Sequence, residues 1–259
     1  MITALKHLTI ITGASRGMGL AMAEKLMAPD RLLLCISRKT HAGLAQAAAA
    51  QGADLTQWEQ DLADTQGAAQ RLQDWLTKLA PSELASATLI NNAGVLTTIG
   101  PLESAPPEGV VNALRVGLEA PMLLTAALLR VTSDWVNGGW RGPRKVLNIS
   151  SGLGRHAMAG QASYCAAKAG MDHFTRGCAL DEAEKPFGAK LVSLAPGVID
   201  TDMQTQLRAG DPAQFPGLQR FIDLKAQGHL SSPEQAAQQV LAWLDREDFG
   251  AVPVADVRD

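Results

Sequence analysis

The only tyrosine of the chain, Tyr164, lies four residues before Lys168 in the stretch GQASYCAAKAG at residues 160–170. At this spacing the two side chains project from the same face of a helix. A phenol has an ordinary pKa of about 10, and a neighbouring ammonium group lowers that pKa by favouring the phenolate. Proton transfer works best when the pKa of the donor lies near the working pH. The pair therefore predicts a proton donor, Tyr164, whose pKa is lowered by Lys168.

A serine follows the apolar run at residues 144–150, thirteen positions before the tyrosine. Hydride transfer to a carbonyl carbon leaves negative charge on the oxygen, which must be stabilised and then protonated. The hydroxyl of Ser151 could hydrogen-bond that oxygen and hold it against Tyr164. We therefore predict Ser151, Tyr164 and Lys168 as catalytic residues, the first two in contact with the substrate.

A glycine-rich turn, TGASRGMG, separates the first apolar run from an alanine-rich segment. Gly13, Gly17 and Gly19 allow a tight turn and let the backbone approach a pyrophosphate at the start of a helix. An ordinary strand–helix turn also uses glycines, so the motif alone leaves both interpretations open. Its position between a predicted strand and a predicted helix favours a dinucleotide site.

The end of the second apolar run indicates which dinucleotide binds. It carries Ser37 and Arg38, with Lys39 next, and no carboxylate where an NAD site usually has one. Together with Arg16 in the glycine turn, these groups suit a ribose 2′-phosphate, because guanidinium groups bind phosphate oxygens in pairs. The alternative is a merely solvated loop. The sequence predicts NADP(H) rather than NAD(H).

Two further segments fit the same ligand. Asp61, with Leu62 beside it, ends the third apolar run and could accept a hydrogen bond from an adenine amino group. The motif NNAG places Asn92, Ala93 and Gly94 after the fourth run, at the sheet edge where open α/β folds bind ligands.

Short apolar runs alternate with longer Ala- and Leu-rich segments along the chain. Strands are predicted at 8–12, 31–37, 54–60, 87–92, 144–150, 189–195 and 251–254, and helices at 17–28, 41–51, 65–80, 107–133, 161–185 and 233–246. This alternation predicts a parallel sheet with helices on both faces, an α/β doubly wound fold in one domain over residues 1–259. The long segment 199–230 breaks the rhythm and is predicted to be a substrate lid.

Composition excludes several classes of protein. The net charge of −3 and the pI near 6.0 leave no basic excess for nucleic acid. No apolar stretch approaches the length of a membrane span, and no signal-peptide pattern is present. Three scattered cysteines indicate free thiols in a reducing compartment, and five scattered histidines lack metal-ligand spacing. We expect a cytoplasmic protein without a metal. Trp135 and Trp140, near glycines, are expected to face a partner or solvent.

The motifs TGASRGMG, NNAG, NISSG, YCAAK and APGVIDTDM, in this order and over essentially the whole chain, resemble the short-chain dehydrogenases/reductases. The resemblance implies a Rossmann-like sheet of about seven strands, hydride transfer from NAD(P)H and the catalytic roles given above. It also implies contacts with the nicotinamide end from the PGV motif and Thr201. The predicted cofactor-binding residues are Gly13, Ser15, Arg16, Gly17, Met18, Gly19, Ser37, Arg38, Asp61, Leu62, Asn92, Ala93, Gly94, Tyr164, Lys168, Pro196, Gly197, Val198, Thr201 and Met203.

The C-terminal motifs DTDMQ, LKAQGHL and EDF are similar to those of sepiapterin reductases and the related bacterial benzil reductases. That likeness implies NADPH-dependent reduction of α-dicarbonyl or α-hydroxycarbonyl compounds. It implies a homodimer that packs through the helices near 107–133 and 161–185. It also places Asp256 where an aspartate of sepiapterin reductases anchors the pterin ring. The alternative for Asp256 is a solvated acid in a loose tail.

One position departs from the family. An asparagine that helps to relay protons is replaced by Gly117, and Asn112 lies more than one helical turn away. Ordered water and backbone carbonyls, or a different proton path, must then serve. The predicted function is an NADPH-dependent reductase of an α-dicarbonyl or a pterin side-chain ketone. A general diketone or xenobiotic reductase without a pterin role is the alternative, and a non-catalytic NADPH sensor is a further one.

Overall fold

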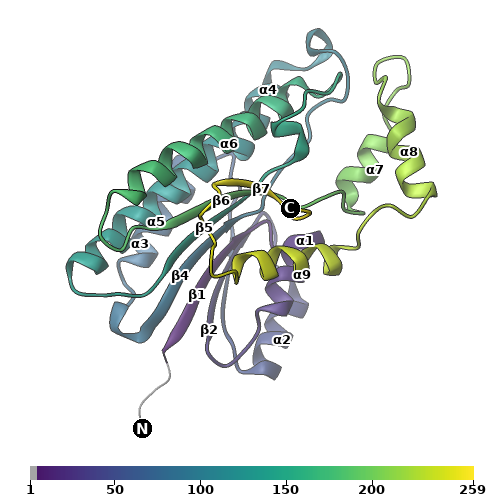
Figure 1. The fold of residues 1–259 in the computed structure, drawn as a ribbon. Helices are drawn as coiled ribbons and strands as arrows, with labels where there is room; N and C mark the ends of the chain where they lie inside the picture. The colour runs from purple at the N-terminus through teal and green to yellow at the C-terminus, as the bar shows by residue number, and fades with distance from the viewer. Residues whose placement is uncertain (1–4) are drawn as a thin grey trace.

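The computed structural model describes residues 5–259, and within them seven strands form one parallel sheet (Figure 1). The strands are β1 (Lys6–Thr12), β2 (Arg31–Ser37), β3 (Asp54–Glu59), β4 (Leu84–Asn91), β5 (Arg144–Ile149), β6 (Lys190–Ala195) and β7 (Val254–Asp256). Their order in the sheet is β3-β2-β1-β4-β5-β6-β7. The order reverses its direction between β1 and β4, and this pair is where doubly wound sheets open a ligand crevice. The predicted fold class is confirmed.

Helices cover both faces of the sheet, which explains why the strands read as nearly continuous apolar runs. The helices are α1 (Gly17–Lys25), α2 (Ala42–Gln51), α3 (Thr65–Leu76), α4 (Pro107–Leu114), α5 (Ala120–Asn137), α6 (Ala162–Ala183), α7 (Asp202–Arg208), α8 (Leu218–Ala226) and α9 (Pro233–Leu244). One core cluster joins the sheet to α1, α2 and α9, and another joins it to α3 and α5. In Figure 1, α4, α5 and α6 lie on the side of the sheet opposite to α1 and α9.

The helix predicted at 107–133 is divided in the structure. A π-helical turn at Arg115–Glu119 separates α4 from α5. Pro121 has no N–H to donate to the carbonyl of Gly117, so a regular α-helical bond is missing there. Gly117 is buried, and a Cβ at this position would lie 3.1 Å from the Cβ of Ala167 on α6. The close approach of the two helices therefore favours glycine.

The expectation for the two tryptophans was wrong for Trp135, which is buried, whereas Trp140 is half-buried. Trp135 belongs to α5 and is only 7% exposed. It meets Trp140 edge to face, with ring centroids 5.5 Å apart, and the indole of Trp140 donates to the carbonyl of Leu84. Each indole thus packs against the body of the protein, because α5 continues beyond its predicted end.

The segment 199–230 contains two short helices. Helices α7 and α8 share a small apolar cluster of Leu207, Phe215 and Phe221, and they stand apart from the sheet in Figure 1. A bridge between Ile199 and Ser231 joins the two ends of the segment.

Candidate active site

A cavity of about 1210 Å³ opens at the carboxyl ends of β1, β4, β5 and β6. Its size exceeds what a typical drug-sized ligand needs and leaves space for a dinucleotide together with a small substrate. The structure brings all the sequence-predicted site residues to this cavity: Gly13, Ser15, Arg16, Gly17, Met18, Gly19, Ser37, Arg38, Asp61, Leu62, Asn92, Ala93, Gly94, Ser151, Tyr164, Lys168, Pro196, Gly197, Val198, Thr201, Met203 and Asp256. Their individual roles stay predictions.

The glycine turn has the conformation that only glycine adopts easily. Gly13 and Gly17 have φ values of +69° and +55°. A Cβ at Gly19 would lie 2.2 Å from the carbonyl oxygen of Gly13, so no larger residue fits there without movement. The first turn of α1 therefore packs directly on the loop and leaves a backbone cradle at the start of the helix, where anions bind well.

The side chain of Asn92 holds the glycine turn against the end of β4. Its amide donates to the carbonyl of Thr12 at 2.9 Å. In return, the hydroxyl of Thr12 accepts from the backbone N–H groups of Asn92 and Ala93 at 2.9 and 3.0 Å. The NNAG motif thus fixes the relative positions of the two strand ends.

The cavity end beside β2 carries polar groups that lack partners in the described residues. The hydroxyl of Ser37 is buried and makes no hydrogen bond within residues 5–259. Arg38, the next residue, is exposed at the cavity wall. Arg16 instead pairs with Asp202 of α7, across the mouth of the cavity. A buried hydroxyl without a partner beside a free guanidinium fits an oxygen-rich group of a ligand.

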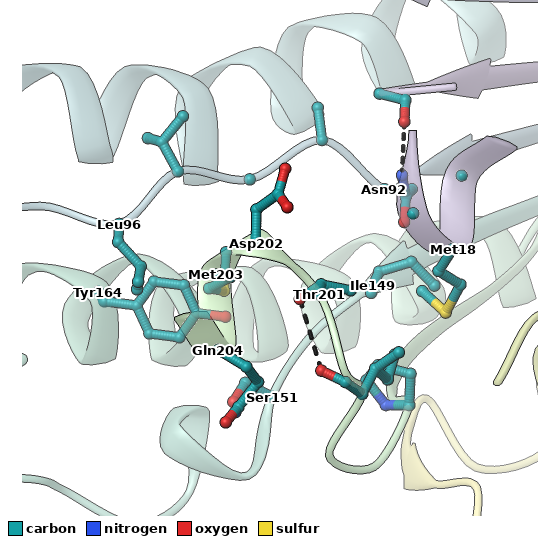
Figure 2. A pocket seen from close by; sticks show the side chains of 18 of the residues that line it. Met18, Asn92, Leu96, Ile149, Ser151, Tyr164, Thr201, Asp202, Met203 and Gln204 are labelled. Carbon is teal, nitrogen blue, oxygen red and sulfur yellow. Dashed lines mark hydrogen bonds between the residues drawn. The ribbon is translucent and has the colours of Figure 1, made fainter. Parts of the chain in front are cut away.

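Ser151 and Tyr164 lie together at one end of the cavity in Figure 2, away from Met18 and Asn92. Ser151 follows β5 and its hydroxyl accepts from the N–H of Leu153. Tyr164 and Lys168 come from successive turns of α6, and the ammonium of Lys168 lies 5.7 Å from the centre of the tyrosine ring. That ammonium donates to the carbonyl of Ile149 at 2.7 Å.

The expected lowering of the tyrosine pKa by Lys168 is wrong for this structure. Burial raises the pKa of Tyr164 to about 12, and a hydrogen bond with Ser151 opposes the change. Burial also lowers the pKa of Lys168 to about 8, against the charge of Asp172. Loss of water around each group is thus the largest cause of both shifts. At neutral pH the phenol keeps its proton, as a proton donor to a substrate oxygen must.

The position of the missing family asparagine offers no polar group. Gly117 lies in the π-helical turn behind Ala167, whereas Asn112 and Val116 of the same helical region line the cavity. Asn112 is therefore the residue of this helical region that brings a side-chain amide to the cavity, although its spacing differs from the family pattern.

Asp256 lies in an ordered pair. It is 7% exposed, and the guanidinium of Arg258 donates to both of its carboxylate oxygens at 2.6 Å. Hydrogen bonds from Arg258 lower the pKa of Asp256. The alternative of a solvated acid in a loose tail is wrong, because β7 and this pair hold the segment.

Sequence reasoning missed several charged residues of this region, three of which pair with or lie beside the predicted site residues. Arg258 and Asp202 line the cavity, and each pairs with a residue that the sequence had singled out. Asp172 lies behind the cavity wall on α6. Only Asp172 left a signal, because it follows Lys168 at the same four-residue spacing that links Tyr164 to Lys168.

The family model described as short chain dehydrogenase matches residues 7–212. This chain belongs to the short-chain dehydrogenase family. It is 35% identical to a benzil reductase ((S)-benzoin forming) of Bacillus cereus over 240 residues, which cover 93% of this chain and 94% of the relative. It is 33% identical to the sepiapterin reductase of Meriones unguiculatus over 261 residues, covering 96% and 95%.

A solved structure of a 3-oxoacyl-[acyl-carrier protein] reductase from Brucella melitensis in complex with NAD has the same fold. Its TM-score is 0.79 at 22% identity, and the match covers 97% of this chain and 95% of that one. As a member of the short-chain dehydrogenase family, the chain is an oxidoreductase that binds NAD(P)(H). The glycine cradle and the unpaired hydroxyl of Ser37 fit such a dinucleotide.

The described residues offer neither a metal cluster nor a membrane-spanning helix. Within residues 5–259, no cluster of three or more His, Cys, Asp or Glu side chains could hold a metal ion. None of the helices in the same range is both long enough and apolar enough to span a membrane.

The two shifted pKa values predict the pH dependence of carbonyl reduction at saturating cofactor and substrate. Tyr164 keeps its proton up to about pH 12, whereas Lys168 loses its charge above about pH 8. If Lys168 acts as predicted in its ammonium form, kcat is level near neutral pH and falls about tenfold per pH unit well above pH 8. Steady-state NADPH oxidation across pH 6–10 measures this, and a level kcat up to pH 10 contradicts it.

Proposed function

We propose that this short-chain dehydrogenase is an NADPH-dependent carbonyl reductase that acts on α-dicarbonyl compounds. The observation that carries the proposal is the convergence of Ser151 and Tyr164, with Lys168 beside the tyrosine ring, at one end of a cavity that the glycine cradle also lines. The benzil reductase and sepiapterin reductase relatives, matched over more than nine-tenths of their length, support the same reaction class.

Each of the three residues has a distinct task in the reduction. The reduction needs a hydride at the carbonyl carbon, which NADPH would supply when held in the cradle of Gly13, Gly17 and Gly19. Ser151 hydrogen-bonds the carbonyl oxygen and orients it, and Tyr164 then gives its phenolic proton to that oxygen as the alcohol forms. Lys168 contributes a buried positive charge beside the tyrosine, which stabilises negative charge on the phenolate left behind.

The preference for NADPH over NADH rests on the groups beside β2. Ser37 and Arg38 have no partners in the described residues that would compete with a 2′-phosphate, and no acidic side chain ends β2. Arg16 could join them only if it left Asp202. Charge-assisted hydrogen bonds to a phosphate are the strongest that such side chains make.

We further propose a diketone-type substrate without a pterin ring as the better of two candidates. A pterin needs a free carboxylate for the paired N–H groups of its amino-pyrimidine. The structure has both oxygens of Asp256 bound by Arg258, whose guanidinium presents a comparable pair of donors. A pterin would have to displace Arg258, whereas a neutral diketone would not.

We also propose a substrate lid, a homodimer and a cytoplasmic location. Segment 199–230 would close over the substrate end as a lid, since its residues Met203 and Phe221 line the cavity. A homodimer would form through α4, α5 and α6, where Val111, Met122 and Leu180 expose apolar side chains. Free Cys35, Cys165 and Cys178 agree with a cytoplasmic location.

The proton-donor assignment is tested by Tyr164→Phe. We expect kcat for benzil reduction to fall by about 10²- to 10⁴-fold, because general acid catalysis is lost while the ring still fills its place. NADPH binding, followed by fluorescence titration, should change less than about threefold. Full activity in Tyr164→Phe would remove Tyr164 from the mechanism.

The cofactor preference is tested by Arg38→Ala. Loss of one charge-assisted hydrogen bond to the 2′-phosphate should raise the KM for NADPH by roughly tenfold to a hundredfold. The KM for NADH serves as the internal control and should stay unchanged, since NADH lacks that phosphate. Equal effects on the two cofactors would contradict the assignment.

The substrate class is tested by comparing sepiapterin with benzil in three proteins: wild type, Asp256→Ala and Arg258→Ala. We expect kcat/KM for benzil to change little in either variant, since benzil has no N–H group for a carboxylate. Arg258→Ala should raise kcat/KM for sepiapterin about tenfold or more, because it frees Asp256. Good wild-type activity on sepiapterin that Asp256→Ala abolishes would instead establish the pterin role.

A further inference from the structure

A carboxylate lies buried on α6, one helical turn beyond Lys168. Asp172 is 1% exposed, and its Oδ1 accepts hydrogen bonds from the hydroxyls of Ser150 at 2.5 Å and Ser193 at 2.7 Å. Its Oδ2 lies 3.5 Å from Nε of Arg155 and accepts no hydrogen bond within the described residues. Burial of an ionised carboxylate is costly unless charges nearby compensate for it.

The partners of Asp172 come from several of the elements that surround Ser151, Tyr164 and Lys168. Ser150 directly precedes Ser151, and Ser193 lies on β6, next to β5. Arg155, in the loop after Ser151, also donates to the carbonyl of Ala255 on β7. The carboxylate therefore connects α6 to the ends of three neighbouring strands.

The loop that carries Ser151 packs unusually tightly on this part of α6. A Cβ at Gly154 would lie 2.8 Å from Oδ2 of Asp172 and 2.9 Å from the carbonyl oxygen of Lys168. Only a glycine allows this approach without displacement. The loop thus covers Oδ2 and keeps the region between Asp172 and Lys168 out of water.

The ammonium of Lys168 has little other electrostatic support. It is 4% exposed, and its hydrogen bond goes to the carbonyl of Ile149, a neutral acceptor. Asp172 is the carboxylate that α6 places one turn along, on the same face.

From these contacts, and resting on the proposed reductase function, we propose that Asp172 is a positioning residue for the reaction. Its buried charge keeps Lys168 in the ammonium form, and its bond to Ser150 holds the strand end from which Ser151 projects. The electrostatic effects on Lys168 have the direction that this role requires. Burial lowers the pKa of Lys168, and the charge of Asp172 raises it.

The other charged and titratable groups that face this region come from several elements. On α6 itself the neighbour is Tyr164. The loop after β5 contributes Arg155, and the end of β7 contributes the pair of Asp256 and Arg258. In the π-helical turn that packs on α6, Arg115 is exposed and Glu119 accepts a hydrogen bond from Thr65.

The decisive experiment uses Asp172→Asn, which keeps the shape of the side chain and removes its charge. We expect the fall of kcat at high pH to begin at least about one pH unit lower than in the wild type. At pH 8.5 a shift of one pH unit corresponds to a loss of kcat of about eightfold, while at pH 6 kcat stays within about threefold of the wild type. A direct readout accompanies it: the titration midpoint of Lys168, followed by NMR of ¹³Cε-labelled lysine in the whole protein, should move down by a similar amount.

Thr175→Val is the matched control. Thr175 is a buried polar residue one turn further along α6, and its hydroxyl accepts from Asn148 at 2.9 Å. Its replacement removes a buried hydrogen bond without changing any charge. We expect a lower Tm for Thr175→Val with unchanged pH dependence of kcat and an unchanged Lys168 midpoint.

Arg155→Gln provides a second variant at a more exposed position. Removal of this cation should move the Lys168 midpoint upward, opposite to Asp172→Asn, because less positive charge then faces the ammonium. If Asp172→Asn does not fold, the direction in which the Lys168 midpoint moves in Arg155→Gln decides whether the proposal holds. A Lys168 midpoint that stays at its wild-type value in the folded variants overturns the proposal for Asp172. The NMR midpoint needs no turnover, so a wild type inactive on every carbonyl would contradict only the proposed function.

Discussion

The structure depends on one seam, the contact between the ends of β1 and β4 where the order of the parallel sheet reverses. The side-chain amide of Asn92 and the hydroxyl of Thr12 exchange hydrogen bonds with each other's backbone across this seam. They fix the glycine turn on one side and the loop after β4 on the other, so the crevice between them has a set width. Gly19 also keeps the turn close to the helix, because any side chain there would clash with the carbonyl of Gly13. The cofactor cradle is therefore made of backbone held in place by packing.

Burial, more than pairing of charges, sets the protonation of the catalytic groups. The phenol of Tyr164 and the ammonium of Lys168 both lose water, which raises the first pKa and lowers the second. Each shift favours the neutral form of its own group. A carboxylate near Lys168 limits the lowering of the lysine pKa. Reduction needs a protonated tyrosine and a charged lysine together. The buried Asp172 reconciles these two requirements, since it acts on Lys168 from behind without approaching the substrate.

Much of the fold and most of the site were predictable from the sequence, and the failures have a common cause. Continuous apolar runs mark strands covered on both faces, and the motifs at their carboxyl ends must converge because parallel strands end at one edge. The break in the helix before α5 depended on Pro121 and Gly117 acting together against α6. The shift of the Tyr164 pKa depended on burial, and the pairing of Asp256 depended on Arg258 two residues away. Each is a property of three-dimensional packing that local spacing does not encode.

The two ends of the cavity differ in the kind of polar group that lacks a partner, and this difference argues for the kind of molecule each end receives. Beside β2, Ser37 and Arg38 lack partners in the described residues, so a charged ligand gains strong bonds there without breaking others. At the catalytic end, Asp256 is bound by Arg258, whereas the buried side-chain oxygens of Gln161 and Gln204 accept no hydrogen bond within the described residues. The rest of this wall includes the apolar side chains of Leu96, Leu153, Met158, Phe221 and Leu224. A substrate there gains mainly from burial of apolar surface and from one carbonyl oxygen placed between Ser151 and Tyr164. A neutral, largely apolar dicarbonyl satisfies both conditions, because it needs no charged partner beyond the groups that carry out the reduction.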